Sequence, residues 1–156
     1  MARFNYRLQG VLNLRLQQEE QAKSDFSEAA RELNEQLDIL EGLKRRKQDY
    51  VEEGYRLRGA NIMDVTEIMY NDNAVDRMDV LIKDQEHKLE RYEAKYEMAR
   101  IKLTRAMQER KMQERLREKA FEQFVEEEKE AESKEMDERT SFTYTKKDAS
   151  GRMNNG

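Results

Sequence analysis

The stretch that decides the fold is residues 75–124, VDRMDVLIKDQEHKLERYEAKYEMARIKLTRAMQERKMQERLREKAFEQF. Stepping along it by alternating threes and fours gives fifteen positions, of which eleven are apolar. An apolar repeat of about 3.5 residues forms one narrow seam along a helix, and that seam is stable only when a partner helix covers it. Near Arg110 the register fails, and Met112 and Leu116 continue the seam in a shifted phase, which locally alters supercoiling.

The composition of the chain excludes several classes of protein. Of its 156 residues, 41% are charged and 37% are hydrophobic, which is too polar for an ordinary globular core. No proline is present to interrupt a helix, and no cysteine is present for a disulfide or a thiol nucleophile. No apolar run approaches the roughly 18 residues of a membrane span, so we expect no direct membrane insertion. The net charge of -4 argues against general binding to nucleic acid, because no excess of cations is available for phosphates.

A second seam precedes the first. Over residues 8–57 the same alternating step gives fifteen positions, of which ten are apolar or aromatic. Gly54 and Gly59 bracket a segment where the first helix can end, and Asp64 followed by Glu67 fits the start of another helix. We therefore predict an all-α fold in which two long helices form an antiparallel coiled-coil hairpin.

The predicted boundaries place a single hairpin domain over residues 1–144. The parts of the chain are a first helix over about 3–57, a tip over about 58–73, a second helix over about 64–139 and a disordered tail over 145–156. The tip and the second helix overlap because the polar residues 71–73 offer a second break. The first residues carry arginines and no acid, as transit peptides do, but they contain no serine, and we interpret them as the first turns of a helix.

The sequence contains no catalytic constellation. The single histidine, His87, lies off the seam, with no cysteine or second histidine to complete a metal site. Two helices enclose no cavity in which the pKa of a carboxylate would shift, and no glycine-rich phosphate motif occurs. We therefore expect a protein that is not an enzyme and needs neither a cofactor nor a metal.

Charge forms two blocks along the second predicted helix. Between Arg100 and Lys119 there are eight basic residues against three acidic ones, and between Glu122 and Glu138 there are nine acidic residues against two basic ones. Such blocks are usually solvated helix faces, and the alternative is that one of them binds an oppositely charged partner. A nucleic-acid-binding helix that used the basic block would bind with a steep salt dependence.

Three segments share a pattern with a known family, namely FNYRLQGVLNLR at 4–15, YNDNAVDRMDVLIKDQ at 70–85 and EKAFEQFVEEEKEAESKEMDE at 118–138. Together they resemble the FliJ family of bacterial flagellar export proteins, over roughly residues 3–144. The resemblance implies a cytoplasmic antiparallel coiled coil, similar to the central stalk of rotary ATPases, that serves flagellum assembly and hence motility and chemotaxis.

The resemblance also implies protein partners. The chain would be the stalk of the flagellar type III export ATPase, FliI, and would contact the export-gate protein FlhA at the cytoplasmic face of the inner membrane. Some members of the family also escort export chaperones. The family positions that contact the gate correspond here to Leu43, Tyr50, Met78, Leu81 and Gln85. This sequence departs from the family at Arg46 and Ala74, where relatives often carry aromatic residues.

The end opposite the tip is the predicted contact with the ATPase. The second helix would extend beyond the first there, at about 1.5 Å per residue, and the chain begins with arginines that have no acid nearby. The residues predicted for this contact are Arg3, Phe4, Arg7, Phe121 and Phe124.

Two alternatives stay open at the level of sequence. One is a purely structural coiled coil, such as a spacer or a self-associating segment, which would satisfy the same periodicity. A stalk of the proposed kind should instead sediment as an elongated monomer of 18.7 kDa. The other concerns Tyr55 and Tyr70 near the tip, which either cap the reversal or contact a partner.

Overall fold

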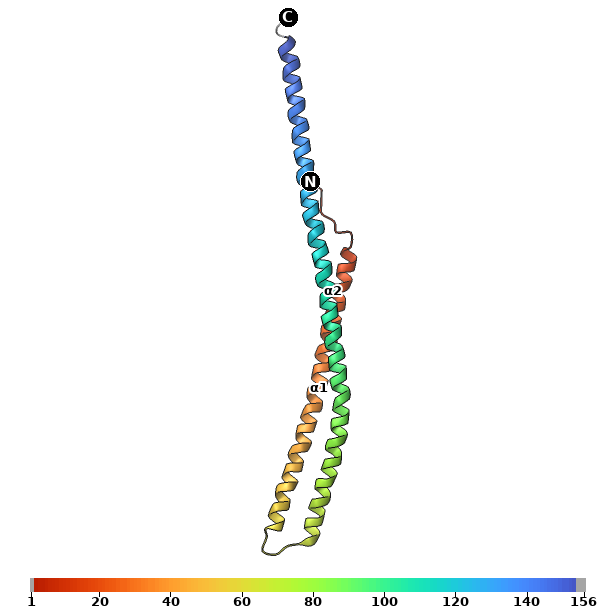
Figure 1. Cartoon of the computed structure of the whole chain (residues 1–156), viewed down its shortest axis with the longest axis vertical. Helices are drawn as coiled ribbons and strands as arrows, with labels where there is room; N and C mark the ends of the chain where they lie inside the picture. Colours follow the sequence, from red (N-terminus) through yellow and green to blue (C-terminus); the bar gives the residue numbers. More distant parts are fainter. Residues whose placement is uncertain (1, 154–156) are drawn as a thin grey trace. The chain divides into compact units, whose positions relative to one another are not determined.

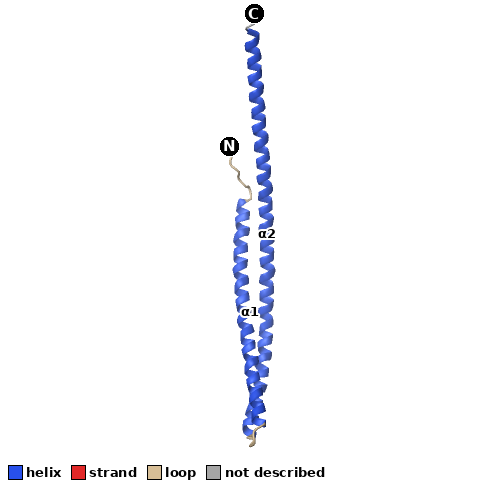
Figure 2. Ribbon diagram, turned by 90° about the vertical axis from the view of Figure 1, so that its left-hand side faces the viewer, coloured by secondary structure: helices blue, strands red, loops and turns tan. Residues whose placement is uncertain are grey.

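Two long helices make up most of the described part of this computed structural model, residues 2–153 (Figure 1). Helix α1 spans Gln9–Arg58 and helix α2 spans Val65–Met153. The chain reverses between them, so the helices run antiparallel and pack against each other (Figure 2). The predicted all-α helical hairpin is therefore confirmed.

The helices contribute to two compact units. The tip unit comprises residues 17–107, and the terminal unit comprises the described residues up to 16 together with those from 108 onward. Figure 2 draws the connection between the helices, and residues 2–8, as loops. Each unit contains one stretch of α1 and one stretch of α2.

A side-chain cap fixes the reversal in the tip unit. Asp64 Oδ1 accepts hydrogen bonds from the backbone N–H groups of Thr66 and Glu67, at 3.0 and 3.3 Å. These bonds satisfy donors that the first turn of a helix leaves without partners, so α2 begins where the sequence predicts. The tip is shorter than the predicted span of 58–73, because only residues 59–64 lie outside the helices.

The second break predicted at residues 71–73 is wrong, since α2 is continuous there. Asn71 is buried, and its Nδ2 donates a 2.8 Å hydrogen bond to the backbone carbonyl of Tyr50 on α1. Gly54 provides the space, because a Cβ atom at that position would lie 2.6 Å from Asn71 Oδ1. A polar residue that suggests a break in the sequence is thus a contact between the helices.

The seam of the tip unit alternates apolar and polar layers. Its buried apolar side chains include Ala29, Leu40, Met78 and Leu89. Between these layers, Gln85 Nε2 donates to the backbone carbonyl and to the side-chain Oε1 of Gln36, at 3.1 and 2.8 Å. A polar pair in a seam lowers stability relative to an apolar layer, but it specifies the register of the two helices.

In the terminal unit the chain pairs with α2 before its first helix begins. We predicted a helix from about residue 3, and this is wrong, because residues 2–8 are not helical. This segment, here called the strap, buries Tyr6, whose hydroxyl donates to Gln113 Oε1 at 3.1 Å. A non-helical chain advances by up to about 3.3 Å per residue and a helix by only 1.5 Å, so the strap reaches farther along α2 than further helical turns would.

α2 continues past the strap as a single helix to Met153 (Figure 1). We predicted a helix end near residue 139 and a disordered tail from 145, and this is wrong for residues 140–153, which are helical. Residues 154–156 of that predicted tail lie outside the described residues. All residues from 129 to 151, here called the extension, are exposed. Within the described chain, neither helix holds a window apolar enough to cross a membrane.

Candidate partner-binding surfaces

The five residues predicted to contact the gate all lie in the tip unit, but at different depths. Leu43 and Tyr50 on α1 are half-buried, and Leu81 on α2 is 43% exposed. Met78 is only 4% exposed, and Gln85 is buried in the polar layer with Gln36. Three of the five side chains can therefore reach a partner directly, and the other two lie inside the seam.

The accessible residues belong to one flank of the tip unit. Tyr50, Leu57, Tyr70 and Ala74 line a shallow groove of about 300 Å³ between α1 and α2. Leu43 lies seven residues before Tyr50, and Leu81 lies seven residues after Ala74, so the helical repeat places both on the same flank as the groove. We call Leu43, Tyr50, Leu57, Tyr70 and Leu81 the tip flank.

A cluster of large apolar side chains around the reversal is exposed. Its members are Tyr55, Ile62, Met63, Val65, Met69 and Tyr70. Ile62 is 89% exposed. Tyr55 and Tyr70 are both 72% exposed, so these tyrosines do not cap the reversal. Sequence reasoning named the tyrosines and missed the other four, although the dipeptide Ile62-Met63 beside the helix cap was a readable signal. Exposed apolar clusters of this kind are typical of surfaces that bind other proteins.

The residues predicted to contact the ATPase are brought together in the terminal unit, largely by contacts with one another. The ring of Phe4 packs against Phe121 edge-on, with centroids 5.2 Å apart, and against Phe124 at 5.4 Å. The Arg117 guanidinium lies 5.7 Å from the centroid of the Phe4 ring, within reach of a cation–π interaction. Phe4 is thus held by α2, while Phe121 still exposes 47% of its surface.

Two other residues of the strap, Arg3 and Arg7, are exposed. They therefore present positive charge beside the Phe4 cluster. Sequence reasoning did not identify Tyr6 or Arg117 as members of this site.

The polar positions in the seam are the sequence signal that could have identified Tyr6 and Arg117. The seam loses its apolar register beyond Arg110, where it places Gln113 and Arg117. In the structure Gln113 accepts the hydrogen bond from Tyr6, and Arg117 lies over Phe4 and donates from Nε to Gln9 Oε1 at 3.1 Å. The seam changes character where its partner changes from a helix to the strap.

Exposed ion pairs shift the pKa values of Glu97 and Lys95. The pKa of Glu97 is lowered, mainly by the hydrogen bond that its exposed carboxylate accepts from Arg100. The pKa of Lys95 is raised, first by its hydrogen bond to Glu32 and then by the charge of that carboxylate. Within residues 2–153, no group of three His, Cys, Asp or Glu side chains is placed to hold a metal ion.

Comparisons with known proteins give one match. The model of the family described as Flagellar FliJ protein matches residues 4–149. No curated protein and no solved structure matches the chain. The matched range includes the whole tip flank and the strap from Phe4 onward.

Proposed function

This chain belongs to the FliJ family of flagellar proteins, and from that membership we propose that it is the stalk of the flagellar export ATPase. Membership in the family gives the chain a role in flagellar protein export. In the proposal it is a non-enzymatic component that links the ATPase, FliI, to the export gate, FlhA, at the cytoplasmic face of the inner membrane. Escort of export chaperones is a further part of the proposed role.

The observation that carries this proposal is the extension of α2. Its residues, 129–151, are helical and exposed throughout, although a single helix in water gains little stability from its own hydrogen bonds. A helix without a partner in its own chain is the part of the molecule that suits insertion into a ring. A ring of similar subunits around one asymmetric helix pair offers shallow contacts and charges, which Arg3, Arg7 and Phe121 can meet.

The tip flank is the proposed contact with the gate. Leu43, Tyr50 and Leu81 provide apolar side chains that are partly exposed on one flank of two packed helices. In this proposal Met78 and Gln85 do not contact the gate themselves. Both are buried between the helices and hold in place the helices that carry the contact residues. The exposed cluster around Ile62 would enlarge the apolar area available to the gate.

A truncation series tests the proposal by measuring ATP turnover of the partner ATPase with each variant added. Truncation after Glu128 removes the extension and keeps the Phe4 contacts with Phe121 and Phe124. We expect this variant to keep the melting temperature of the full chain, because the side chains of the extension are exposed, and to lose stimulation of ATP hydrolysis.

Truncation after Lys119 serves as the harsher comparison. It also removes Phe121 and Phe124, so we expect it to lower the melting temperature as well as to abolish stimulation. Full stimulation by the Glu128 truncation would show that the extension does not engage the ATPase.

A further inference from the structure

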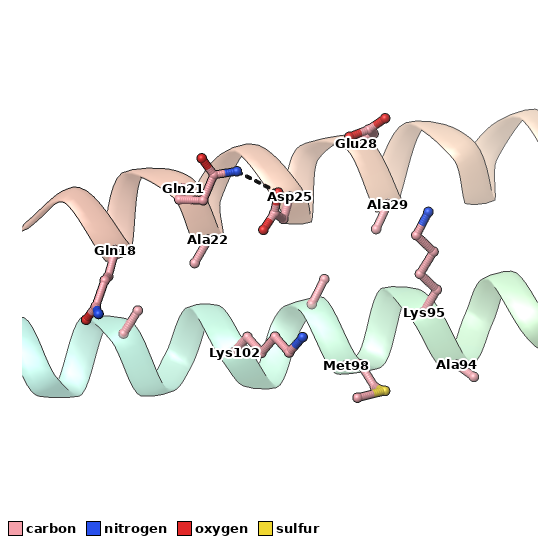
Figure 3. A pocket seen from close by; sticks show the side chains of 12 residues that line it. Gln18, Gln21, Ala22, Asp25, Glu28, Ala29, Ala94, Lys95, Met98 and Lys102 are labelled. Atoms are coloured by element: carbon pink, nitrogen blue, oxygen red, sulfur yellow. Dashed lines mark hydrogen bonds between the residues drawn. The ribbon is translucent and has the colours of Figure 1, made fainter. Parts of the chain in front are cut away.

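The tip unit contains a groove that the proposed contacts with the ATPase and the gate do not use. It lies between α1 and α2, has a volume of about 740 Å³ and is separate from the groove at Tyr50 (Figure 3). Its floor is made by alanines from both helices, namely Ala22, Ala29, Ala99 and Ala106, and the exposed Ala94 lies at its edge. Met98 lies beside them with 59% of its surface exposed.

The groove exists because the large side chains of this part of the seam pack against each other outside it. The rings of Phe26 and Tyr96 pack against each other with centroids 5.1 Å apart, and neither residue lines the groove. Alanine side chains are short, so where they replace large seam residues they leave a depression between the helices. Ala22 and Ala29 are seven residues apart, as are Ala99 and Ala106, so the depression follows the heptad repeat.

The two walls of the groove carry opposite charges. Asp25 and Glu28 stand on the α1 side, and Lys95 and Lys102 stand on the α2 side (Figure 3). Lys95 is paired with Glu32 at 2.7 Å, whereas Lys102 forms no ion pair with any described residue. An occupant would therefore meet acids along one edge and a base along the other.

We propose that this groove is the docking site for one amphipathic helix of a second protein. An apolar ridge with a heptad repeat would fill the alanine floor, which itself repeats at seven residues. One edge of the bound helix would carry basic residues facing Asp25 and Glu28, and the other would carry acidic residues facing Lys102. The docked helix would complete a local bundle of three helices.

A second copy of this chain does not fit the same groove. The helical segment that has no partner within the hairpin, the extension, carries six acidic residues and five basic ones. Its apolar and aromatic residues are Ala131, Met136, Phe142, Tyr144 and Ala149, which do not share one ridge of a heptad repeat and so would not fill the alanine floor. A helix with a continuous apolar ridge and oppositely charged edges would therefore come from a different protein.

Two synthetic peptides of about three heptads test this proposal, both with leucines along one ridge. The mixed-edge peptide has lysines along one edge and glutamates along the other, and the acidic-edge peptide has glutamates along both. Either peptide can lie in the groove in both directions, so the comparison does not depend on orientation. By fluorescence anisotropy with the full chain, we expect the mixed-edge peptide to bind at least about tenfold more tightly than the acidic-edge peptide.

Charge reversal on one wall should invert that preference. Asp25→Lys with Glu28→Lys makes both walls basic, so the acidic-edge peptide should become the tighter ligand. The matched control is Asp38→Lys with Asp49→Lys, which makes the same charge change at exposed positions of α1 outside the groove and should leave the preference unchanged.

Ala94→Glu tests the edge of the groove, because Ala94 lines it and is exposed, so its replacement should not disturb the hairpin. We expect it to abolish binding of the mixed-edge peptide, with an unchanged circular dichroism spectrum. Equal binding of the two peptides, or binding that survives Ala94→Glu, would overturn the proposal. Sedimentation of the full chain would also overturn it if the chain formed dimers that Ala94→Glu dissociates, since the occupant would then be a second copy.

Discussion

For two glycines of α1, we predict that substitution by alanine has opposite effects on the free energy of unfolding. A Cβ atom at Gly42 would meet nothing within 4 Å, whereas one at Gly54 would lie 2.6 Å from Asn71 Oδ1. We expect Gly42→Ala to raise the free energy of unfolding by up to about 1 kcal/mol, the usual gain of alanine over glycine inside a helix. Gly54→Ala should lower it, because displacing Asn71 breaks its hydrogen bond to Tyr50, at a cost of about 1–3 kcal/mol for a buried polar group.

Chemical denaturation of both variants beside the parent chain measures these changes. Asn71→Ala is the control for Gly54→Ala. In the Asn71→Ala background the Gly54 substitution should no longer destabilise, because the clashing amide is absent. A stabilising effect of Gly54→Ala in the parent chain would contradict the proposed role of this glycine.

Substitutions of Met78 and Leu81 distinguish the role of the buried seam from that of the exposed tip flank. Met78 is buried, so we expect Met78→Ala to lower the free energy of unfolding by about 2–4 kcal/mol. Leu81→Ala should have a smaller effect on unfolding and should weaken binding to the gate protein. Urea titrations and binding measurements with purified gate protein distinguish the two effects. If Leu81→Ala bound the gate as tightly as the parent chain does, the tip flank would not be the contact.

At the level of residues, the sequence predicts the buried seam well, but it does not predict which of the proposed contact residues are buried. Met78, Leu89 and Leu40 lie at predicted seam positions and are buried. Gln85 was assigned to the gate because its position matches the contact surface of the family, yet it is buried and Gln36 on the opposite helix satisfies it. Which polar residues face each other depends on the register of the hairpin, and the repeat of a single helix does not contain that information.

Among the structural elements, the strap yields the most direct prediction. Phe4 holds the strap through Phe121, Phe124 and Arg117, so Phe4→Ala should release residues 2–8 from α2. Trypsin should then cleave after the exposed Arg7 faster than in the parent chain, and mass spectrometry of a timed digest would follow the product. Leu14→Ala, at a residue of α1 that is 49% exposed, is the control and should leave the rate unchanged. An unchanged rate for Phe4→Ala would mean that the phenylalanine cluster does not hold the strap.

Element boundaries were predicted best where a side chain marks them. The start of α2 follows from Asp64, whose carboxylate caps the helix in the manner that its sequence context indicates. The start of α1 does not follow from local sequence, because Phe4 and Tyr6 are held out of the helix by contacts with distant parts of α2. The end of α2 was misjudged because a polar sequence suits an exposed helix and a disordered tail equally well.

At the scale of the whole molecule, the charge at the strap should control the ATPase. We expect Arg3→Glu with Arg7→Glu to weaken stimulation of ATP hydrolysis and to reduce its dependence on salt. Charge steering between exposed groups is screened over about 8 Å at physiological ionic strength. Both arginines are exposed, so the melting temperature should stay the same.

ATP turnover with the ATPase, measured at several salt concentrations, checks this expectation. Arg77→Glu with Arg91→Glu is the matched control, since it makes the same charge change at exposed positions of the tip unit. Loss of stimulation by the control pair to the same degree would point to total charge instead of charge at the strap.

The length of the exposed extension determines which way the far end of the helix faces, and so which side of it a partner meets. Each residue removed from residues 129–151 turns the rest of the helix by about 100° and shortens it by about 1.5 Å. Deletions of seven or eleven residues there would leave the far end within about 20° of its original direction, whereas a deletion of nine would turn it by about 180°. If the ATPase recognises one side of this helix, stimulation should survive deletions of seven and eleven and fail at nine. A steady decline with length would mean that the ATPase responds to reach and not to direction.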